Sequence, residues 1–208
     1  METFSIGACL RYGFETFKKR PWYLVGVFLL VSGGSSLLSK IIIQGGDSRG
    51  AFLVVAAFVV NFAVGTLAGL GLAAFVLKAH DTIESVTLAD LWHPSLFWNY
   101  AIAAVLYGLI VVIGLILLII PGIVLMLAYW FTPYIVVDRG LGPLEALKES
   151  ARITKGRRLD LFLLLLAVLG LNIIGAILLF VGLLVSIPVT TLAVVHAYRT
   201  LTRMAPAA

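Results

Sequence analysis

The sequence predicts an all-α fold: a polytopic membrane helix bundle with about six transmembrane helices and two interfacial amphipathic helices, in a single transmembrane domain over residues 1–208. Of the residues, 62% are hydrophobic and 12% are charged, against roughly 45–50% and 25% in soluble domains. The charges cluster and leave uncharged runs over 91–137 and 161–195. Each run exceeds the roughly 20 apolar residues that cross a bilayer. Hydrocarbon is therefore the expected solvent for most of the chain.

The first predicted element is an interfacial helix over residues 4–18, which is too short and too polar to span a bilayer. Its expected apolar stripe consists of Ile6, Leu10, Phe14 and Phe17. The single cysteine, Cys9, excludes an internal disulfide framework and is expected to act as a small apolar residue at the interface.

Two spans are predicted next, over residues 22–43 and 51–77, joined by a short turn over 44–50. Small residues over 32–36, and glycines at 65 and 69, predict faces that pack closely inside the bundle. The polar stretch over 78–96 predicts a solvated connector with a short helix whose N-cap is Thr87 or Ser85.

The third and fourth spans are predicted over residues 97–120 and 123–137, with the turn at Pro121-Gly122. A continuous helix over both would be about 60 Å long, twice the thickness of the hydrocarbon core. Pro133 is expected to kink the fourth span or to end it early.

The remaining elements are a cytoplasmic basic helix over residues 143–155 and two spans over 159–180 and 183–198, joined by a tight hairpin. The basic helix is expected to place cations beside the apolar Leu144 and Leu147. The hairpins over 97–137 and 159–198 share a loose glycine and proline pattern that is compatible with an internal repeat.

Basic residues predict the orientation, because cytoplasmic loops carry an excess of Lys and Arg. With six spans and the N-terminus inside, thirteen of the fifteen basic residues fall on the cytoplasmic side, and only Lys40 and Arg49 fall outside. Both termini are therefore expected in the cytoplasm. The net charge of +5 does not predict nucleic-acid binding, since the cations flank apolar segments rather than covering a solvated face.

Several segments resemble the YciC-like family of bacterial inner-membrane proteins and the membrane domain of some glycerophosphoryl diester phosphodiesterases. The similar segments are LLIIPGI at 117–123, WFTPY at 130–134, GPLEALKES at 142–150 and TKG at 154–156. The resemblance implies a multi-pass protein of the bacterial cytoplasmic membrane and supplies no catalytic residues.

No catalytic constellation, metal site or cofactor is expected, because the three histidines lack metal-ligand spacing and the predicted spans hold almost no ionisable groups. His80, Asp81 and Glu84 are interpreted as part of the solvated connector. His196 is expected to make an interfacial or interhelical hydrogen bond. Asn61 and Asn172 lie near mid-membrane and are interpreted as interhelical contacts or, alternatively, as part of a substrate path.

The main candidate site is a basic cluster that could bind lipid headgroups or a protein partner, or that could serve only as a topological signal. It consists of Lys148, Arg152, Lys155, Arg157 and Arg158. The sequence thus favours a non-enzymatic membrane protein that supports envelope or lipid homeostasis, through membrane lipids, other membrane proteins or self-association. The alternative is a transporter or channel for a lipid-like or apolar substrate, with Asn61, Asn172 and the region around Pro133 lining the path.

Overall fold

The computed structural model describes residues 4–45, 51–178 and 181–205, and these residues form helices and short connections without a β-strand. The α-helices are α1 Ile6–Lys19, α2 Pro21–Gly45, α3 Ala51–Asp81, α4 Phe97–Leu117, α5 Ile119–Tyr129, α6 Thr132–Arg139, α7 Pro143–Thr154, α8 Arg158–Ile177 and α9 Leu183–Met204. Two 3-10 helices, η1 Leu88–Leu91 and η2 Pro94–Leu96, lie between α3 and α4.

The lengths and compositions of these helices suit a multi-pass membrane protein. Among the described residues, five helical stretches are long and apolar enough to cross a membrane: Val55–Asp81, Leu88–Leu117, Ile119–Arg139, Arg158–Ile177 and Leu183–Met204. A shorter apolar stretch, Pro21–Leu37, belongs to α2. Most of the predicted turn between α2 and α3, at residues 46–50, lies outside the described residues.

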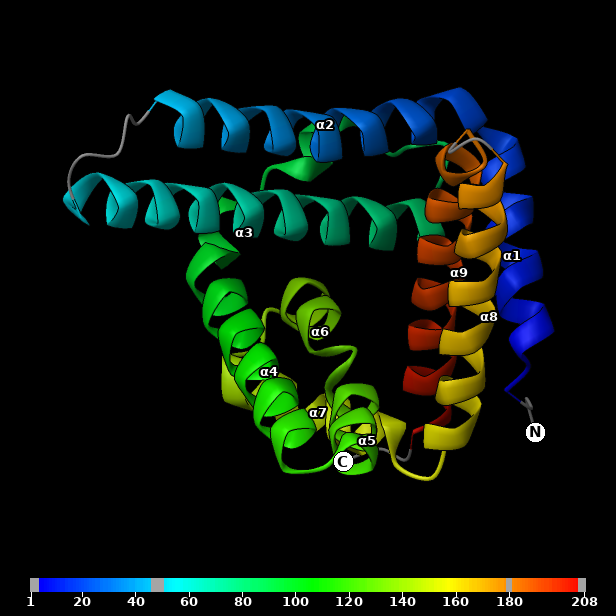
Figure 1. The fold of residues 1–208 in the computed structure, drawn as a ribbon. Helices are drawn as coiled ribbons and strands as arrows, with labels where there is room; N and C mark the ends of the chain where they lie inside the picture. Colours follow the sequence, from blue (N-terminus) through cyan, green and yellow to red (C-terminus); the bar gives the residue numbers. More distant parts are fainter. Residues whose placement is uncertain (1–3, 46–50, 179–180, 206–208) are drawn as a thin grey trace.

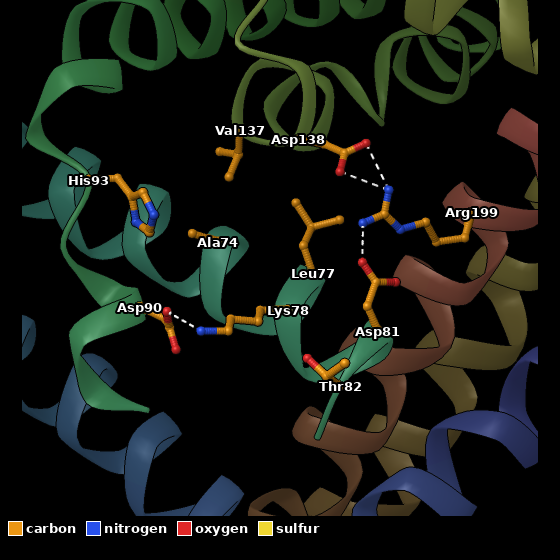
Figure 2. Close-up of a pocket in the computed structure, with 10 residues that line it drawn as sticks. All are labelled: Ala74, Leu77, Lys78, Asp81, Thr82, Asp90, His93, Val137, Asp138 and Arg199. Atoms are coloured by element: carbon orange, nitrogen blue, oxygen red, sulfur yellow. Dashed lines mark hydrogen bonds and ion pairs between the residues drawn. The ribbon is translucent and has the colours of Figure 1, made fainter. Parts of the chain in front are cut away.

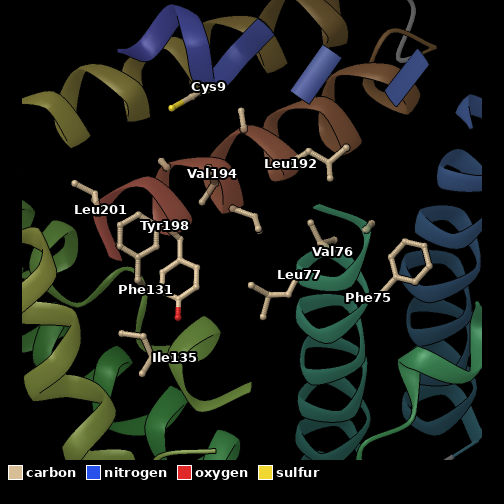
Figure 3. Packing of buried hydrophobic residues seen from close by; sticks show 14 of the residues in the cluster. Cys9, Phe75, Val76, Leu77, Phe131, Ile135, Leu192, Val194, Tyr198 and Leu201 are labelled. Atoms are coloured by element: carbon tan, nitrogen blue, oxygen red, sulfur yellow. The ribbon is translucent and has the colours of Figure 1, made fainter. Parts of the chain in front are cut away.

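Figure 1 shows α2 and α3 lying side by side and running across the direction of α8 and α9. Helices α4 and α5 form a tight hairpin, and α6 packs against both α3 and α4. Helix α9 lies at the centre of the bundle. In its most apolar 18-residue stretch, 56% of the residues are buried, against 17% in the corresponding stretch of α8. The buried residues of α9 include Leu192, Tyr198 and Leu201, and the ring of Tyr198 packs against Phe131 beside Ile135 (Figure 3).

Helix α1 packs along α9, and its buried face differs from the predicted apolar stripe. Cys9, Gly13, Thr16 and Phe17 are buried, whereas Phe14 is 46% exposed beneath the ammonium of Lys18. Of the predicted stripe, Phe17 is buried and Phe14 is exposed. The small residues of the buried face let α1 approach the backbone of α9. A Cβ atom at Gly13 would lie 3.1 Å from the amide nitrogen of Ala193.

The predicted turn at Pro121-Gly122 was placed three residues too late. The chain reverses at Leu118, whose backbone is extended, and Pro121 lies in the first turn of α5. Proline suits this position because the first amide groups of a helix have no partner inside the helix. The backbones of α4 and α5 approach each other closely at this turn, since a Cβ atom at Gly114 would lie 3.0 Å from the Cα atom of Gly122.

The predicted break at Pro133 is present, because α5 ends at Tyr129 and Pro133 lies in the first turn of the short helix α6. The connector also contains the predicted N-cap: Thr87 caps η1, with its N–H and its hydroxyl both donating to Asp90 Oδ2. Helix α9 extends to Met204, six residues beyond the predicted end.

The small-residue faces predicted in α2 and α3 make close contacts in part. On α3, a Cβ atom at Gly69 would lie 2.9 Å from the Tyr100 hydroxyl of α4, and one at Gly71 would overlap the carbonyl oxygen of Leu91. Cβ atoms added to Gly33, Gly34 or Gly65 would meet nothing within 4 Å among the residues that the structure describes. Further close approaches occur between α1 and α9, and at the tips of the two hairpins. At the second tip, a Cβ atom at Gly175 would lie 3.0 Å from the carbonyl carbon of Gly182.

Candidate functional site

The predicted basic helix corresponds to α7, and its buried face fixes it against α5. The hydroxyls of Ser150 and Thr154 both donate to the carbonyl oxygen of Ala128, at 2.9 and 3.1 Å. Ala146 and Ile153 are buried on the same side. Because this face is held in place, the basic residues on the remaining surface have defined positions.

Two of the five predicted basic residues form ion pairs within the protein. Arg152 binds Glu149 through Nε and Nη2, each at 2.7 Å, and Arg139 binds the same carboxylate at 2.7 Å. Arg157 contacts Asp160 at 3.3 Å. The hydrogen bond from Arg152 is the main cause that lowers the pKa of the Glu149 carboxyl below its usual value. The Glu149 carboxylate therefore compensates one of the two positive charges of Arg139 and Arg152.

The other three basic residues, Lys148, Lys155 and Arg158, are exposed at the surface. Two leucines near them are also exposed: Leu144 at 64% and Leu159 at 72%. Leu147, which the sequence analysis grouped with Leu144, is buried. Exposed cations beside exposed leucines are the composition of a surface that lies at a membrane interface. We call these five exposed residues the basic rim.

A second polar group, absent from the predicted sites, joins α3, α6 and α9. The guanidinium Nη1 of Arg199 contacts both carboxylate oxygens of Asp138, at 2.7 and 2.9 Å, and Nη2 donates to Asp81 at 2.6 Å. The Tyr198 hydroxyl donates to Asp138 at 2.7 Å. One guanidinium thus links three helices.

His80 belongs to this group, so its interpretation as part of a solvated connector was wrong. Its side chain is only 7% exposed, with Nδ1 at 2.9 Å from Asp81 and Nε2 at 3.1 Å from His196 Nδ1. The ring of Tyr12 stacks on His196, and its hydroxyl donates to the carbonyl of His80. The interhelical hydrogen bond predicted for His196 is therefore confirmed.

A charged cavity of about 320 Å³ adjoins Arg199, between α3, the connector and α6. Figure 2 shows His93 and Asp90 of the connector on one side, and Asp138 and Arg199 on the other. Lys78 also lines it and is paired with Asp90 at 2.7 Å. Two buried nitrogens of lining residues, His93 Nδ1 and Arg199 Nε, have no hydrogen-bond partner among the described residues.

An aromatic cavity of about 340 Å³ lies farther toward the N-terminal end of α3. Its wall includes Tyr100, Tyr107, Trp130, Pro133 and Tyr134. The Tyr107 hydroxyl lies 3.5 Å from the carbonyl of Met126, while no partner within the described part of the chain binds the hydroxyl of Tyr100 or Tyr134. From the sequence, Tyr107, Tyr129, Trp130 and Tyr134 could line a lipid-facing groove or act as interfacial anchors. Tyr107, Trp130 and Tyr134 line this cavity, and Tyr129 does not.

Asn172 and Asn61 do not line either cavity. Asn172 joins α8 to α9: its amide donates to Thr190 Oγ1 at 3.3 Å, and its carbonyl oxygen accepts from Ser186 at 2.8 Å. Asn61 is half-buried on α3. The structure thus places the two asparagines apart from the proposed path around Pro133.

No group of three or more His, Cys, Asp or Glu side chains suited to a metal ion occurs in the parts of the chain that the structure describes. The network around Arg199 was missed because its members come from three distant segments. The available signal was the presence of Asp138 and Tyr198-Arg199 at the ends of apolar runs, where a charge is costly unless it is paired.

Three comparisons with known proteins bear on the identity of the chain. The uncharacterized proteins Rv2560 of Mycobacterium tuberculosis and Mb2590 of Mycobacterium bovis are each 30% identical to it over 118 residues. The match covers 57% of this chain and 36% of each relative, so the chain spans little more than a third of their length. No solved structure matches significantly. The family model described as "Protein of unknown function (DUF975)" matches residues 95–205, which is more than half of the chain and includes α4 to α9. The chain therefore belongs to the DUF975 family.

Proposed function

We propose that this protein is a non-enzymatic component of the bacterial cytoplasmic membrane that binds anionic lipid headgroups and so supports envelope or lipid homeostasis. The observation that carries the proposal is the basic rim, in which Lys148, Lys155 and Arg158 are exposed next to Leu144 and Leu159. Each cation near an anionic leaflet contributes about 1 kcal/mol of attraction. The exposed leucines add apolar area that favours the interface.

The proposal assigns different roles to the five predicted basic residues. Arg152 and Arg157 each have a carboxylate partner three residues away, Glu149 within α7 and Asp160 at the start of α8. Lys148, Lys155 and Arg158 are the lipid-binding residues. The same surface is also available to another membrane protein or to a second copy of the chain.

Lipid retention by the full-length protein tests this assignment. The protein is reconstituted in nanodiscs of mixed phosphatidylglycerol and phosphatidylethanolamine, and the retained phosphatidylglycerol is counted by native mass spectrometry. The triple variant Lys148→Gln, Lys155→Gln, Arg158→Gln is expected to retain several-fold less, since about 3 kcal/mol of attraction is removed at most. The charge-preserving variant Lys148→Arg, Lys155→Arg, Arg158→Lys is the matched control and should behave like the wild type. Equal retention by all three proteins would remove the proposal.

The proposed orientation places both termini in the cytoplasm, as the distribution of basic residues favours. A reporter fused after Ala208 is expected to be active only in its cytoplasmic form. Activity of a periplasmic reporter at the same site would reverse the orientation and move the basic rim away from the anionic inner leaflet. The relation to YciC-like proteins remains part of this proposal and rests on the segments quoted above.

Transport of a lipid-like or apolar substrate is the second candidate, and the aromatic cavity beside Pro133 is the observation that favours it. Its test is the movement of a fluorescent phospholipid between leaflets of proteoliposomes. If the wild type moves the phospholipid between leaflets and Tyr134→Trp, which fills the cavity, does not, transport is supported. A rate equal to that of protein-free vesicles would exclude it.

A further inference from the structure

The charged and aromatic cavities follow one another along the same three helices. On α6, Pro133 and Tyr134 line the aromatic cavity, and Val137 and Asp138, one helical turn farther, line the charged one. On α3, Leu72 and Ala73 line the first, whereas Ala74 and Leu77 line the second. On α9, Thr191 lines the aromatic cavity and Arg199 the charged one. The two cavities are therefore adjacent levels of one region.

One cavity has a charged lining and the other an aromatic lining, as expected for sites that bind the headgroup and the ester region of a phospholipid. The charged level holds Lys78 and Arg199 together with Asp81, Asp90 and Asp138, so both signs are present and negative charge is in slight excess. A purely anionic headgroup fits this lining poorly. Lys78 and Arg199 are paired with these carboxylates, so a bound headgroup must join existing ion pairs. A headgroup with both an ammonium and a phosphate can do so with each charge beside the opposite sign and without adding net charge.

The unpartnered nitrogens beside the charged cavity point to the same ligand. Arg199 Nε is a hydrogen-bond donor, and His93 Nδ1 donates in one tautomer. Buried polar atoms usually have partners, so two such atoms on one cavity indicate an acceptor supplied from outside the chain. His93 and Arg199 lie on opposite sides of the cavity (Figure 2), so the phosphate oxygens and the other polar atoms of one headgroup can each accept from one of them.

The aromatic cavity offers hydrogen-bond donors and apolar surface, which suit the ester groups and the beginning of the acyl chains. The Tyr100 and Tyr134 hydroxyls, which have no partner in the described residues, can donate to ester carbonyl oxygens. The rings of these tyrosines and of Trp130 offer apolar surface to the beginning of the acyl chains. Both cavities, of about 320 and 340 Å³, lie within the usual range for small-molecule sites, about 300–1,000 Å³.

We infer that these two cavities form a binding site for one phospholipid with a zwitterionic phosphate and amine headgroup. The headgroup occupies the cavity between Lys78, His93 and Arg199, and the ester groups lie against Tyr100 and Tyr134. This site is distinct from the basic rim on α7 and does not depend on it.

Binding can be tested with delipidated full-length protein in detergent, to which one of four ligands is added. A ligand that binds the folded protein raises its Tm. The four ligands are phosphatidylethanolamine, phosphatidylglycerol with the same acyl chains, the corresponding diacylglycerol, and free phosphoethanolamine. Phosphatidylethanolamine is expected to bind at least about tenfold more tightly than each of the others. An equal affinity for phosphatidylglycerol or for diacylglycerol would overturn the zwitterionic headgroup site, and an equal affinity for phosphoethanolamine would exclude an amphiphile.

Conservative variants locate the site without disturbing the fold. Tyr100→Phe combined with Tyr134→Phe keeps both rings and is expected to weaken phosphatidylethanolamine binding about tenfold, since two hydrogen bonds are removed. His93→Phe is expected to weaken it about fivefold. The controls are Tyr129→Phe, outside both cavities, and Lys148→Gln, on the basic rim; both should bind like the wild type. Unchanged binding by the double tyrosine variant, or a loss caused by Lys148→Gln alone, would contradict the proposed site.

Discussion

Arg199 of α9 holds Asp138 of α6 with its Nη1 atom between the two carboxylate oxygens, at 2.7 and 2.9 Å. Both side chains are largely buried, at 21% and 15% exposure. The other Nη atom of Arg199 reaches Asp81 at the end of α3. This single residue therefore sets the relative positions of three helices that are far apart in sequence.

Removing the arginine is expected to cost more stability than removing an exposed cation. Arg199→Met leaves Asp138 without its counter-ion, and such a loss costs about 3–5 kcal/mol when the remaining charge is buried. Thermal unfolding in detergent should show a large decrease in Tm. Adding Asp138→Leu should recover part of the loss. Arg11→Met, which removes a well-exposed pair with Glu15, is the control and should leave Tm unchanged. A stable Arg199→Met protein would show that the pair does not hold the helices.

The contact between α1 and α9 is expected to tolerate no side chain at Gly13. A Cβ atom there would overlap the Val189 carbonyl oxygen and lie 3.1 Å from the Ala193 nitrogen. Gly13→Ala should destabilise the protein by about 1–3 kcal/mol, because backbone on both sides must move. Gly26→Ala is the matched control, since no atom of the described residues lies within 4 Å of its added Cβ. The control should keep or raise Tm, because alanine favours helix more than glycine by up to about 1 kcal/mol. Equal Tm values for the two variants would contradict the packing.

Cys9 is expected to report whether α1 is docked. The side chain is 1% exposed, and burial raises the pKa of its thiol to about 11. Because the thiolate is the reactive form, N-ethylmaleimide should modify the folded protein slowly at neutral pH. Gly13→Ala should accelerate the reaction, measured by mass spectrometry. The control is Ser5→Cys in a Cys9→Ser background, at an exposed position, which should react rapidly with or without Gly13→Ala.

Acidification is expected to weaken the attachment of α7 through Glu149. Its folded-state pKa is lowered, mainly by the hydrogen bond from Arg152, with burial opposing the shift and Arg139 adding to it. The stabilisation is therefore complete above the unfolded-state pKa of glutamate, near 4.3, and is lost as the pH falls through the lower folded-state value. Solvent at Arg139 and Arg152 limits the effect to about 1 kcal/mol.

The pH dependence of Tm between about pH 3 and 7 measures this contribution. Glu149→Gln should have a lower Tm than the wild type near neutral pH, and the two values should converge on acidification. Glu145→Gln, on the exposed side of α7, is the control. A Tm difference that stays constant over the whole range would show that Glu149 acts through packing and not through its charge.

The local sequence by itself was enough to predict a membrane environment, the helices and most of the helix ends. The apolar runs exceed the length that crosses a bilayer, and prolines at 121, 133 and 143 lie in first turns of helices, where a missing amide costs little. The Thr87 cap was also predictable, since Asp90 stands three residues farther along. Such features depend only on neighbours along the chain.

Tertiary structure alone decided which side chains meet. Glycines that looked alike in sequence differ in role: Gly13 packs against the backbone of α9, whereas a Cβ atom added to Gly33 or Gly34 would meet nothing within 4 Å in the described part of the chain. Likewise, Asp81, Asp138 and Arg199 are isolated charges in sequence and become one network only when α3, α6 and α9 converge. The physical reason is that helix faces in a uniformly apolar chain carry no periodic contrast, so hydrophobicity cannot tell a lipid-facing side from a protein-facing one. Close packing and the pairing of rare charges make that choice, and both are properties of the assembled bundle.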